Sequence, residues 1–235
     1  MKTRNRIRVI ALLIIAIVGV VAPSANAAAT RYITVSAQGT VQVTPDAVRI
    51  NATATNVAST SKDALAANAK TANAVRAALK ASKVDSKDIA TQSVSVYPEY
   101  KYAADGSSTQ IGYRASQSFS IVVRAADTAG SIVDSLVVAG GDNLQINGAN
   151  PFVLDSTKSL ESARAAAVKS AKSKATSYAQ LMGVKLGKVN YLVENSSPAN
   201  YSPVMAVAKA ESDATVIDLG HQDVTISVTV QWALL

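Results

Sequence analysis

The sequence predicts an α+β fold in which two long helices and one shorter helix pack on a mostly antiparallel sheet. Segments of period-two alternation are interspersed with helical segments, as expected when helices cover one face of a sheet. Several neighbouring strands are joined by short turns, which favour antiparallel pairing; the expected turns are at Gly39, at Pro45-Asp46 and at Ala103 to Ser108.

The strands are predicted from alternating apolar and polar residues. The alternation is clearest near the carboxyl end, where apolar residues from Val224 to Trp232 interleave with Thr, Ser and Gln, so one face is expected to be buried. The other expected strands are Tyr32 to Thr44, Ala47 to Val57, Ala90 to Tyr100, Ile111 to Ala125, Leu144 to Phe152 and Leu186 to Glu194.

Three helices are predicted, the first starting near Ser61 with hydroxyl caps nearby, the second from Asp127 to Ala139, and the third from a cap at Asp155 to Met182. Their abundant alanine favours helix formation and close approach to a sheet. The expected buried faces are Leu65, Ala72, Val75 and Leu79 in the first helix, Ile132, Leu136 and Val137 in the second, and Val168, Ala171, Ala175, Tyr178 and Met182 in the third.

The hairpin from Ala90 to Ala125 is long enough to extend past the core, and a protruding ribbon favours a partner. It carries the tyrosines Tyr97, Tyr100, Tyr102 and Tyr113, which we take as candidates for an oligomer interface because such side chains are enriched at interfaces. Cross-strand pairing that only stiffens the ribbon is the alternative. The segment from Ser196 to Ala214 is predicted to be an irregular loop, either plain or used in oligomer contacts.

The amino end is typical of a secretory signal peptide. Four basic residues precede an uncharged apolar run from Val9 to Ala22, and small residues at Ala25 and Ala27 fit a cleavage site. We therefore expect residues 1–27 to be a Sec-type signal peptide, residues 28–235 to form a single domain, and the protein to be secreted or periplasmic. A membrane is expected as a partner only through an uncleaved signal segment.

Charge and cysteine content exclude several classes of function. The whole chain has a formal net charge of +7, but the signal segment supplies four of its 23 basic residues and none of its 16 acidic ones, so the remainder is nearly neutral. Nucleic acid is therefore not expected as a partner. With no cysteine, thiol catalysis and Cys-zinc sites are excluded.

The sequence nominates no catalytic, cofactor-binding or metal-binding residue. The single histidine, His221, is expected to lie at the surface just before the last strand. The carboxylates are scattered, and Asp127 and Asp155 are better explained as helix caps. We expect a protein that is not an enzyme and needs no cofactor.

Several stretches, in this order and spacing, resemble the SIMPL-domain family of bacterial periplasmic and secreted proteins over essentially the whole mature chain. They are Val35 to Ala47, Asp88 to Ser93, Gly112 to Ser116, Ala139 to Gly141, Gln145 to Gly148, Ala163 to Val168 with Lys174-Ala175, Leu186-Gly187, and Val228 to Leu234. The sequence departs from the family pattern at Ala37 and at Gly220-His221-Gln222, both of which we expect at turns.

The resemblance implies an α+β fold, export, large homo-oligomers, and a link to envelope or oxidative stress and to immunogenicity, with no established catalytic activity. We therefore expect a non-enzymatic, self-assembling envelope protein. Two alternatives stay open: an extracytoplasmic module that binds a small molecule or peptide at an exposed hairpin edge, and an enzyme acting through carboxylates brought together by folding.

Overall fold

The computed structural model describes residues 31–195, 203–204 and 214–235. The expected signal peptide and most of the loop from Ser196 to Ala214 lie outside the described residues. The α+β class is confirmed: all strand pairs are antiparallel, and three α-helices pack on them.

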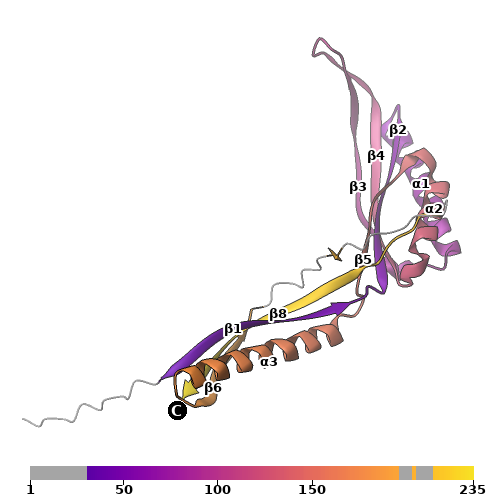
Figure 1. Cartoon of the computed structure of the whole chain (residues 1–235). Coiled ribbons are helices and arrows are strands. Elements are labelled where there is room, and N and C mark those ends of the chain that lie inside the picture. The colour runs from indigo at the N-terminus through magenta and orange to yellow at the C-terminus, as the bar shows by residue number, and fades with distance from the viewer. Residues whose placement is uncertain (1–30, 196–202, 205–213) are drawn as a thin grey trace, which may run out of the picture.

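The strands form two separate sheets (Figure 1). One has the order β3-β4-β2-β5 and carries α1 and α2, and we call it the hairpin lobe; the other has the order β1-β8-β6, with β7 also paired to β8, and carries α3, and we call it the α3 lobe. The hairpin lobe comprises β2 (Ala47–Ala58), α1 (Ser61–Ala81), β3 (Ile89–Tyr102), β4 (Ser108–Val123), α2 (Ala129–Gly140) and β5 (Leu144–Phe152), with the short 3-10 turns η1 (Ser86–Asp88), η2 (Ala126–Thr128) and η3 (Gly141–Asn143). The α3 lobe comprises β1 (Tyr32–Val43), α3 (Thr157–Leu181), β6 (Leu186–Glu194), β7 (Pro203–Val204) and β8 (His221–Leu234).

Each lobe has its own hydrophobic core. In the hairpin lobe, branched and aromatic side chains such as Leu79, Phe119 and Leu136 fill the space between sheet and helices. In the α3 lobe, the inward face of β8 meets a stripe of alanines on α3; the buried residues of this helix are Ala163, Ala167, Ala171, Ala175 and Ala179. The expected close approach of alanine-rich helix to sheet is confirmed there.

The predicted helices are present, but part of each predicted buried face is wrong. The exposed members of those faces are Leu65 in α1, Val137 in α2, and Val168, Tyr178 and Met182 in α3. In α1 and α3 the sheet is instead contacted by small or polar residues one or more positions away, among them Ala64, Asn68 and Ala163. The helix start at Ser61 is confirmed, because the Thr60 hydroxyl accepts a hydrogen bond from the Asp63 N–H at 3.1 Å.

Two of the three expected turns are not turns between paired strands. Gly39 lies inside β1, where a side chain would collide with α3: an added Cβ would lie 2.2 Å from the Ala163 carbonyl oxygen. Pro45-Asp46 connects β1 to β2, which belong to different sheets, so this segment carries the chain from one lobe to the other. The third turn is confirmed by the Ala103 N–H, which donates to the Ser107 carbonyl at 2.9 Å.

The lobes are tied together at a junction. The Gln222 side chain donates to the Pro151 carbonyl at 2.7 Å, and the Leu154 N–H donates to the Asp46 carboxylate at 2.8 Å. The segment before β8 also packs on the hairpin lobe, where the Thr215 hydroxyl donates to Asp134 at 2.6 Å. From this junction the two lobes extend in different directions (Figure 1).

Candidate functional site: the protruding ribbon

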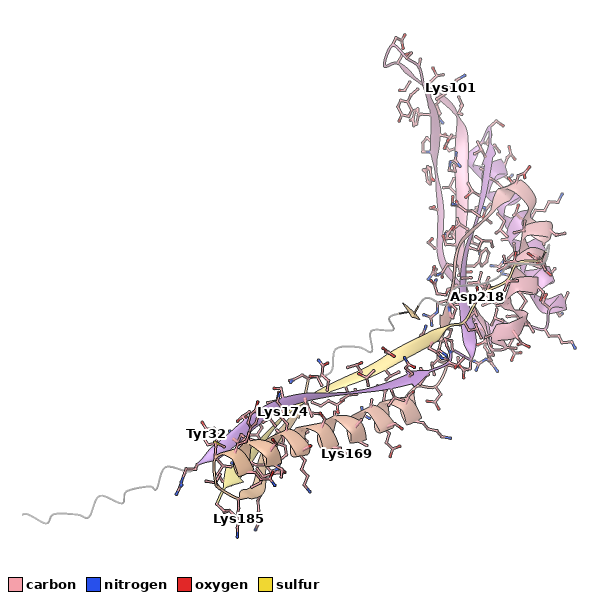
Figure 2. The ribbon with its side chains drawn as sticks, viewed as in Figure 1. Tyr32, Lys101, Lys169, Lys174, Lys185 and Asp218 are labelled. Carbon is pink, nitrogen blue, oxygen red and sulfur yellow. The ribbon has the colours of Figure 1, made fainter. Side chains whose placement is uncertain are left out.

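The outer half of the β3–β4 hairpin projects beyond the rest of its sheet as a two-stranded ribbon (Figure 1). β2 pairs with β4 only as far as Tyr113, so the part of β4 before this residue has β3 as its one partner within the described chain. Figure 2 shows Lys101 near the tip of the ribbon, far from Asp218 at the base of the lobe. The protruding hairpin expected from the sequence is therefore present.

Two irregularities in the pairing decide which side chains share a face of the ribbon. In β3, Thr91 pairs with Phe119 but Ser93 pairs with Ser118, so Gln92 is an extra residue and the alternation of the strand is inverted beyond it. In β4, Ile111 is the extra residue of a second irregularity. Beyond Gln92, the even-numbered residues of β3 lie on the same side of the sheet as the helices.

The register brings three of the four candidate tyrosines onto one side of the ribbon. Tyr100 and Tyr102 lie on the helix side of β3, and Tyr113 lies there too because it pairs with Pro98. Tyr97 lies on the opposite side, where it pairs with Arg114. Their use in oligomer contacts stays a prediction, now with three residues on one surface and one on the other.

Two valines lie on the same side of the ribbon as Tyr100, Tyr102 and Tyr113. Val94 and Val96 precede Tyr100 and Tyr102 on the helix side of β3, and the four side chains are 56%, 38%, 43% and 75% exposed. With Pro98 and Tyr113 they form what we call the apolar ribbon face. Exposed apolar side chains gathered on one side of a strand mark an interaction surface more often than single scattered ones do.

The apolar ribbon face also borders an unpaired strand edge. β3 is fourteen residues long and is the outer strand of its sheet in the described part of the chain. Pro98 lies in the middle of it, and a proline in an edge strand directs its nitrogen, which has no hydrogen, away from the sheet. Pro98 therefore interrupts the row of backbone N–H donors along this edge. A partner is better accommodated by side-chain packing on the apolar ribbon face than by continuous addition of a strand to the edge.

The opposite side of the ribbon is polar and held by an ion pair. The Arg114 guanidinium donates to both carboxylate oxygens of Glu99, and its Nε lies 2.6 Å from Glu99 Oε2. These hydrogen bonds hold the pKa of Glu99 below its ordinary value. Next to this pair, Thr55 and Ser116 hydroxyls lie 3.3 Å apart across β2 and β4. Apart from Tyr97, the residues of β3 on this side beyond Gln92 are polar or charged, so the two sides of the ribbon differ in polarity.

No catalytic arrangement assembles around the histidine or the carboxylates that the structure describes. His221 is exposed at the start of β8, with its Nδ1 3.3 Å from the Thr44 hydroxyl. Asp85 and Asp88 line one cavity of about 300 Å³, but Arg124 binds Asp88 at 2.7 and 2.8 Å and holds its pKa below the ordinary value. Asp85 pairs with Lys87 at 2.9 Å. A carboxyl group kept ionised in this way is a poor general acid.

Metal ligands are similarly dispersed. Within residues 31–195, 203–204 and 214–235, no three His, Asp or Glu side chains gather in a way that could hold a metal ion. Asp155, expected to cap α3, accepts from the Thr157 N–H at 3.0 Å, one residue before the helix cap Ser156.

Sequence reasoning did not identify the valines of the apolar ribbon face. Alternation alone places Val94 and Val96 on the same side as Tyr100 and Tyr102, and this pattern was available in the sequence. The bulge at Gln92 places these valines and tyrosines on the helix side of the sheet, in a part of the ribbon that the helices do not cover. The residues around Gln92 give no clear sequence signal for this bulge.

Taken together, the fold and the ribbon define an antiparallel α+β protein with a long, exposed hairpin (Figure 1). The chain belongs to the SIMPL family, described as a protein of unknown function (DUF541), whose model matches residues 33–232. The family resemblance expected from the sequence is thus confirmed.

Similar proteins are found in several bacteria. The chain is 28% identical over 211 residues to the 26 kDa periplasmic immunogenic protein of Brucella melitensis biotype 1, covering 84% of this chain and 82% of that protein. It is 30% identical over 150 residues to the uncharacterized protein YggE of Edwardsiella ictaluri, covering 61% of each chain. It is 28% identical over 188 residues to YggE of Escherichia coli K12, covering 77% of this chain and 72% of that one.

The expected location outside the cytoplasm is confirmed by the periplasmic relatives, which match most of the chain. In the portion of the chain that the structure describes, no helix has the length and apolar character needed to cross a membrane. The signal peptide itself stays a prediction.

Proposed function

We propose that this protein is a non-enzymatic component of the cell envelope that assembles into homo-oligomers through the apolar ribbon face. The observation that carries the proposal is the one-sided ribbon: Val94, Val96, Tyr100 and Tyr102 are exposed together on one side, while an ion pair occupies the other. Exposed apolar surface of this kind is stabilised when a second copy covers it.

Oligomeric state is the direct test, measured by sedimentation velocity or light scattering on residues 28–235 at micromolar concentration. The wild-type chain is expected to have a mass above that of a monomer. The double substitution Val96→Lys with Tyr100→Ser places a charge on the apolar ribbon face and is expected to give monomers.

A matched control is available on the other side of the same strand. Ser93→Lys with Ser95→Lys places charges next to Val94 and Val96 in the sequence but on the opposite side of β3, and is expected to leave the assembly intact. A wild-type protein that is strictly monomeric contradicts the proposal, and so does an assembly that the control pair disrupts and the face pair does not.

The alternative of a peptide-binding module uses the edge of β3 instead of its face. An extended peptide would add as a strand to this edge, but Pro98 interrupts the row of donors there. Titration of the monomeric variant with extended peptides distinguishes the two functions, because strand addition needs the backbone edge and not Val96 or Tyr100.

The proposal includes the link to envelope or oxidative stress that the family resemblance implies. A deletion strain complemented with the wild-type gene is expected to survive oxidant treatment better than one complemented with the Val96→Lys, Tyr100→Ser variant. Equal survival of the two complemented strains would show that any stress function does not require assembly.

A further inference from the structure

A cavity opens at the carboxyl end of α1, at the base of β3 and away from the apolar ribbon face. Its volume is about 730 Å³, within the range of small-molecule sites. The residues that line it are Arg76, Lys80, Lys83, Val84, Asp85, Ser86 and Ile89. The lining combines cationic groups with apolar side chains.

Three cations line this cavity, two from α1 and one from the turn that follows it. Arg76 and Lys80 are four residues apart, which places them on one side of α1, and Lys83 follows the end of the helix at Ala81. The one carboxylate of the lining, Asp85, pairs with Lys87. In the part of the chain that the structure describes, none of the three cations forms an ion pair within 4.0 Å.

The guanidinium of Arg76 is positioned but not saturated. It lies over the ring of Phe119 at 5.2 Å, and its hydrogen bonds to Asn73 and Thr91 are both long, at 3.4 Å. A guanidinium has five N–H donors, so most of them stay available to a ligand. Arg76 is also too far from the last turn of α1 for the helix dipole to explain its place there.

The backbone at Lys83 is strained, and its counterpart in the other lobe is a glycine. Lys83 has a φ of 61°, the one positive value among the non-glycine residues that the structure describes. Gly183 has a φ of 68° after α3. The two helix ends are otherwise the same, because the N–H of Val84 donates to Leu79 and that of Val184 to Ala179, at 2.9 and 3.0 Å.

A lysine at this position therefore costs stability that a glycine would not. Strain of this kind persists mainly where a side chain serves a function. The side chain in question belongs to the cavity lining, beside Lys80 and Arg76. Helix capping explains the backbone at residue 83, but it does not explain why the residue is lysine.

The balance of charge indicates the ligand. Three cations and one carboxylate leave two positive charges in the lining. A phosphate monoester carries close to two negative charges at neutral pH and offers three acceptor oxygens to lysine and arginine donors. The Ser86 hydroxyl is a further donor, and Val84 and Ile89 provide an apolar surface for an organic group.

We propose that this cavity binds the phosphate monoester group of an organic molecule, with the phosphate against Arg76, Lys80 and Lys83 and the organic part against Val84 and Ile89. The site is separate from the apolar ribbon face, so it does not depend on self-assembly. The phosphate group can belong to a soluble ester or to a lipid head group, and the two sources share the chemistry.

Two probes distinguish these sources. Calorimetric titration of residues 28–235 with phenyl phosphate tests the soluble ester, with phenol as the probe that lacks the anion. Sedimentation with phosphatidylcholine vesicles, with and without phosphatidic acid, tests the lipid. Saturable binding of phenyl phosphate or of the phosphatidic acid vesicles, without binding of phenol or of plain vesicles, supports the proposal. Binding of neither probe overturns it.

Lys83→Gly gives the sharpest variant, because it removes a charge and relieves strain together. The melting temperature without ligand is expected to rise by about 2–4 °C, while affinity for the probe falls at least about tenfold. Arg76→Gln is expected to lower affinity by a similar factor. Lys70→Gln, an exposed charge loss elsewhere on α1, is the control and is expected to change neither property.

A Lys83→Gly protein that binds as tightly as the wild type overturns the proposal. The same holds if Lys70→Gln weakens binding as much as Lys83→Gly does, since net charge alone would then explain the affinity. A Lys83→Gly protein that binds less tightly but is no more stable contradicts the argument from strain, while its loss of affinity still supports the place of Lys83 in the site.

Discussion

The hairpin lobe and the α3 lobe bury the same kind of alternating strand face beneath helices whose buried faces differ in size. Large side chains such as Leu79 and Leu136 are among the buried residues of α1 and α2, together with smaller ones such as Ala72, whereas every buried residue of α3 is an alanine. Gly39 completes the contact in the α3 lobe, since a side chain there would meet the helix backbone. We therefore expect the hairpin lobe to be destabilised most by substitutions that remove side-chain volume, and the α3 lobe by substitutions that add it.

The largest expected effect comes from adding one methyl group to the α3 lobe. In Gly39→Ala the Cβ would lie 2.2 Å from both the Ala163 oxygen and the Ala167 nitrogen, so α3 must move away from β1. We expect the free energy of unfolding to fall by about 3 kcal/mol or more. Trp232, the one tryptophan of the chain, is buried in this lobe and reports its unfolding by fluorescence.

Gly148→Ala in β5 is the matched control, because its Cβ would approach its nearest neighbour, the Asn150 side chain, at 3.4 Å. It is expected to change stability by less than about 0.5 kcal/mol. If Gly39→Ala were tolerated as well as this control, the close packing of α3 would not be what holds its lobe together.

The next effect comes from removing volume in the hairpin lobe. Leu79→Ala leaves a cavity among fully buried neighbours and is expected to lower stability by about 3 kcal/mol. Thermal unfolding followed by far-UV circular dichroism measures this loss. Because no element of one lobe packs extensively on an element of the other in the described chain, the Trp232 transition is expected to move much less.

Leu65→Ala makes the same change in the same helix at a site that is 45% exposed. We expect it to cost less than about 0.5 kcal/mol. If Leu79→Ala shifted the unfolding transition of Trp232 as much as the transition seen by circular dichroism, the two lobes would unfold as one unit in spite of their separate cores.

The smallest effect is a pH dependence confined to the hairpin lobe. Arg124 holds the pKa of Asp88 below its ordinary value of about 3.9, so the carboxylate stabilises the fold fully above that pH and progressively less as the pH falls through the lowered value. The difference in melting temperature between wild type and Asp88→Asn is expected to be constant from about pH 5 to 7 and to shrink below about pH 4.

Arg124→Gln is the partner variant for this measurement. It is expected to match Asp88→Asn above pH 5, and the double variant is expected to lose no more than either alone. A difference in melting temperature between wild type and variant that persists unchanged into strong acid would contradict a stabilising role for the ion pair.

Much of the secondary structure could be predicted because strand alternation and helix caps are local signals. The bounds of β5 and β6 match the prediction, and so does the start of α1. The helix faces were predicted less well, because large apolar residues were given more weight than alanine. In α3, Val168 and Tyr178 are exposed, and the buried residues are alanines at every fourth position.

The division into two sheets could not be predicted from local signals. A short Pro-Asp segment between two strands fits a hairpin turn as well as a crossing, and only the pairing of β1 with the distant β8 decides between them. Of the candidate site, the tyrosines could be nominated by composition. Their distribution over the two sides of the ribbon depends on the bulge at Gln92, which is a property of the paired strands.

The pairing of β1 with β8 bears on the order in which the chain folds. The first strand is synthesised long before the last, since paired residues such as Ser36 and Thr229 are 193 positions apart. All strands of the hairpin lobe emerge between them, so that lobe can close while β1 still has an alternating, unpaired edge. During that interval the unpaired edges of β1 are exposed to pairing with other chains.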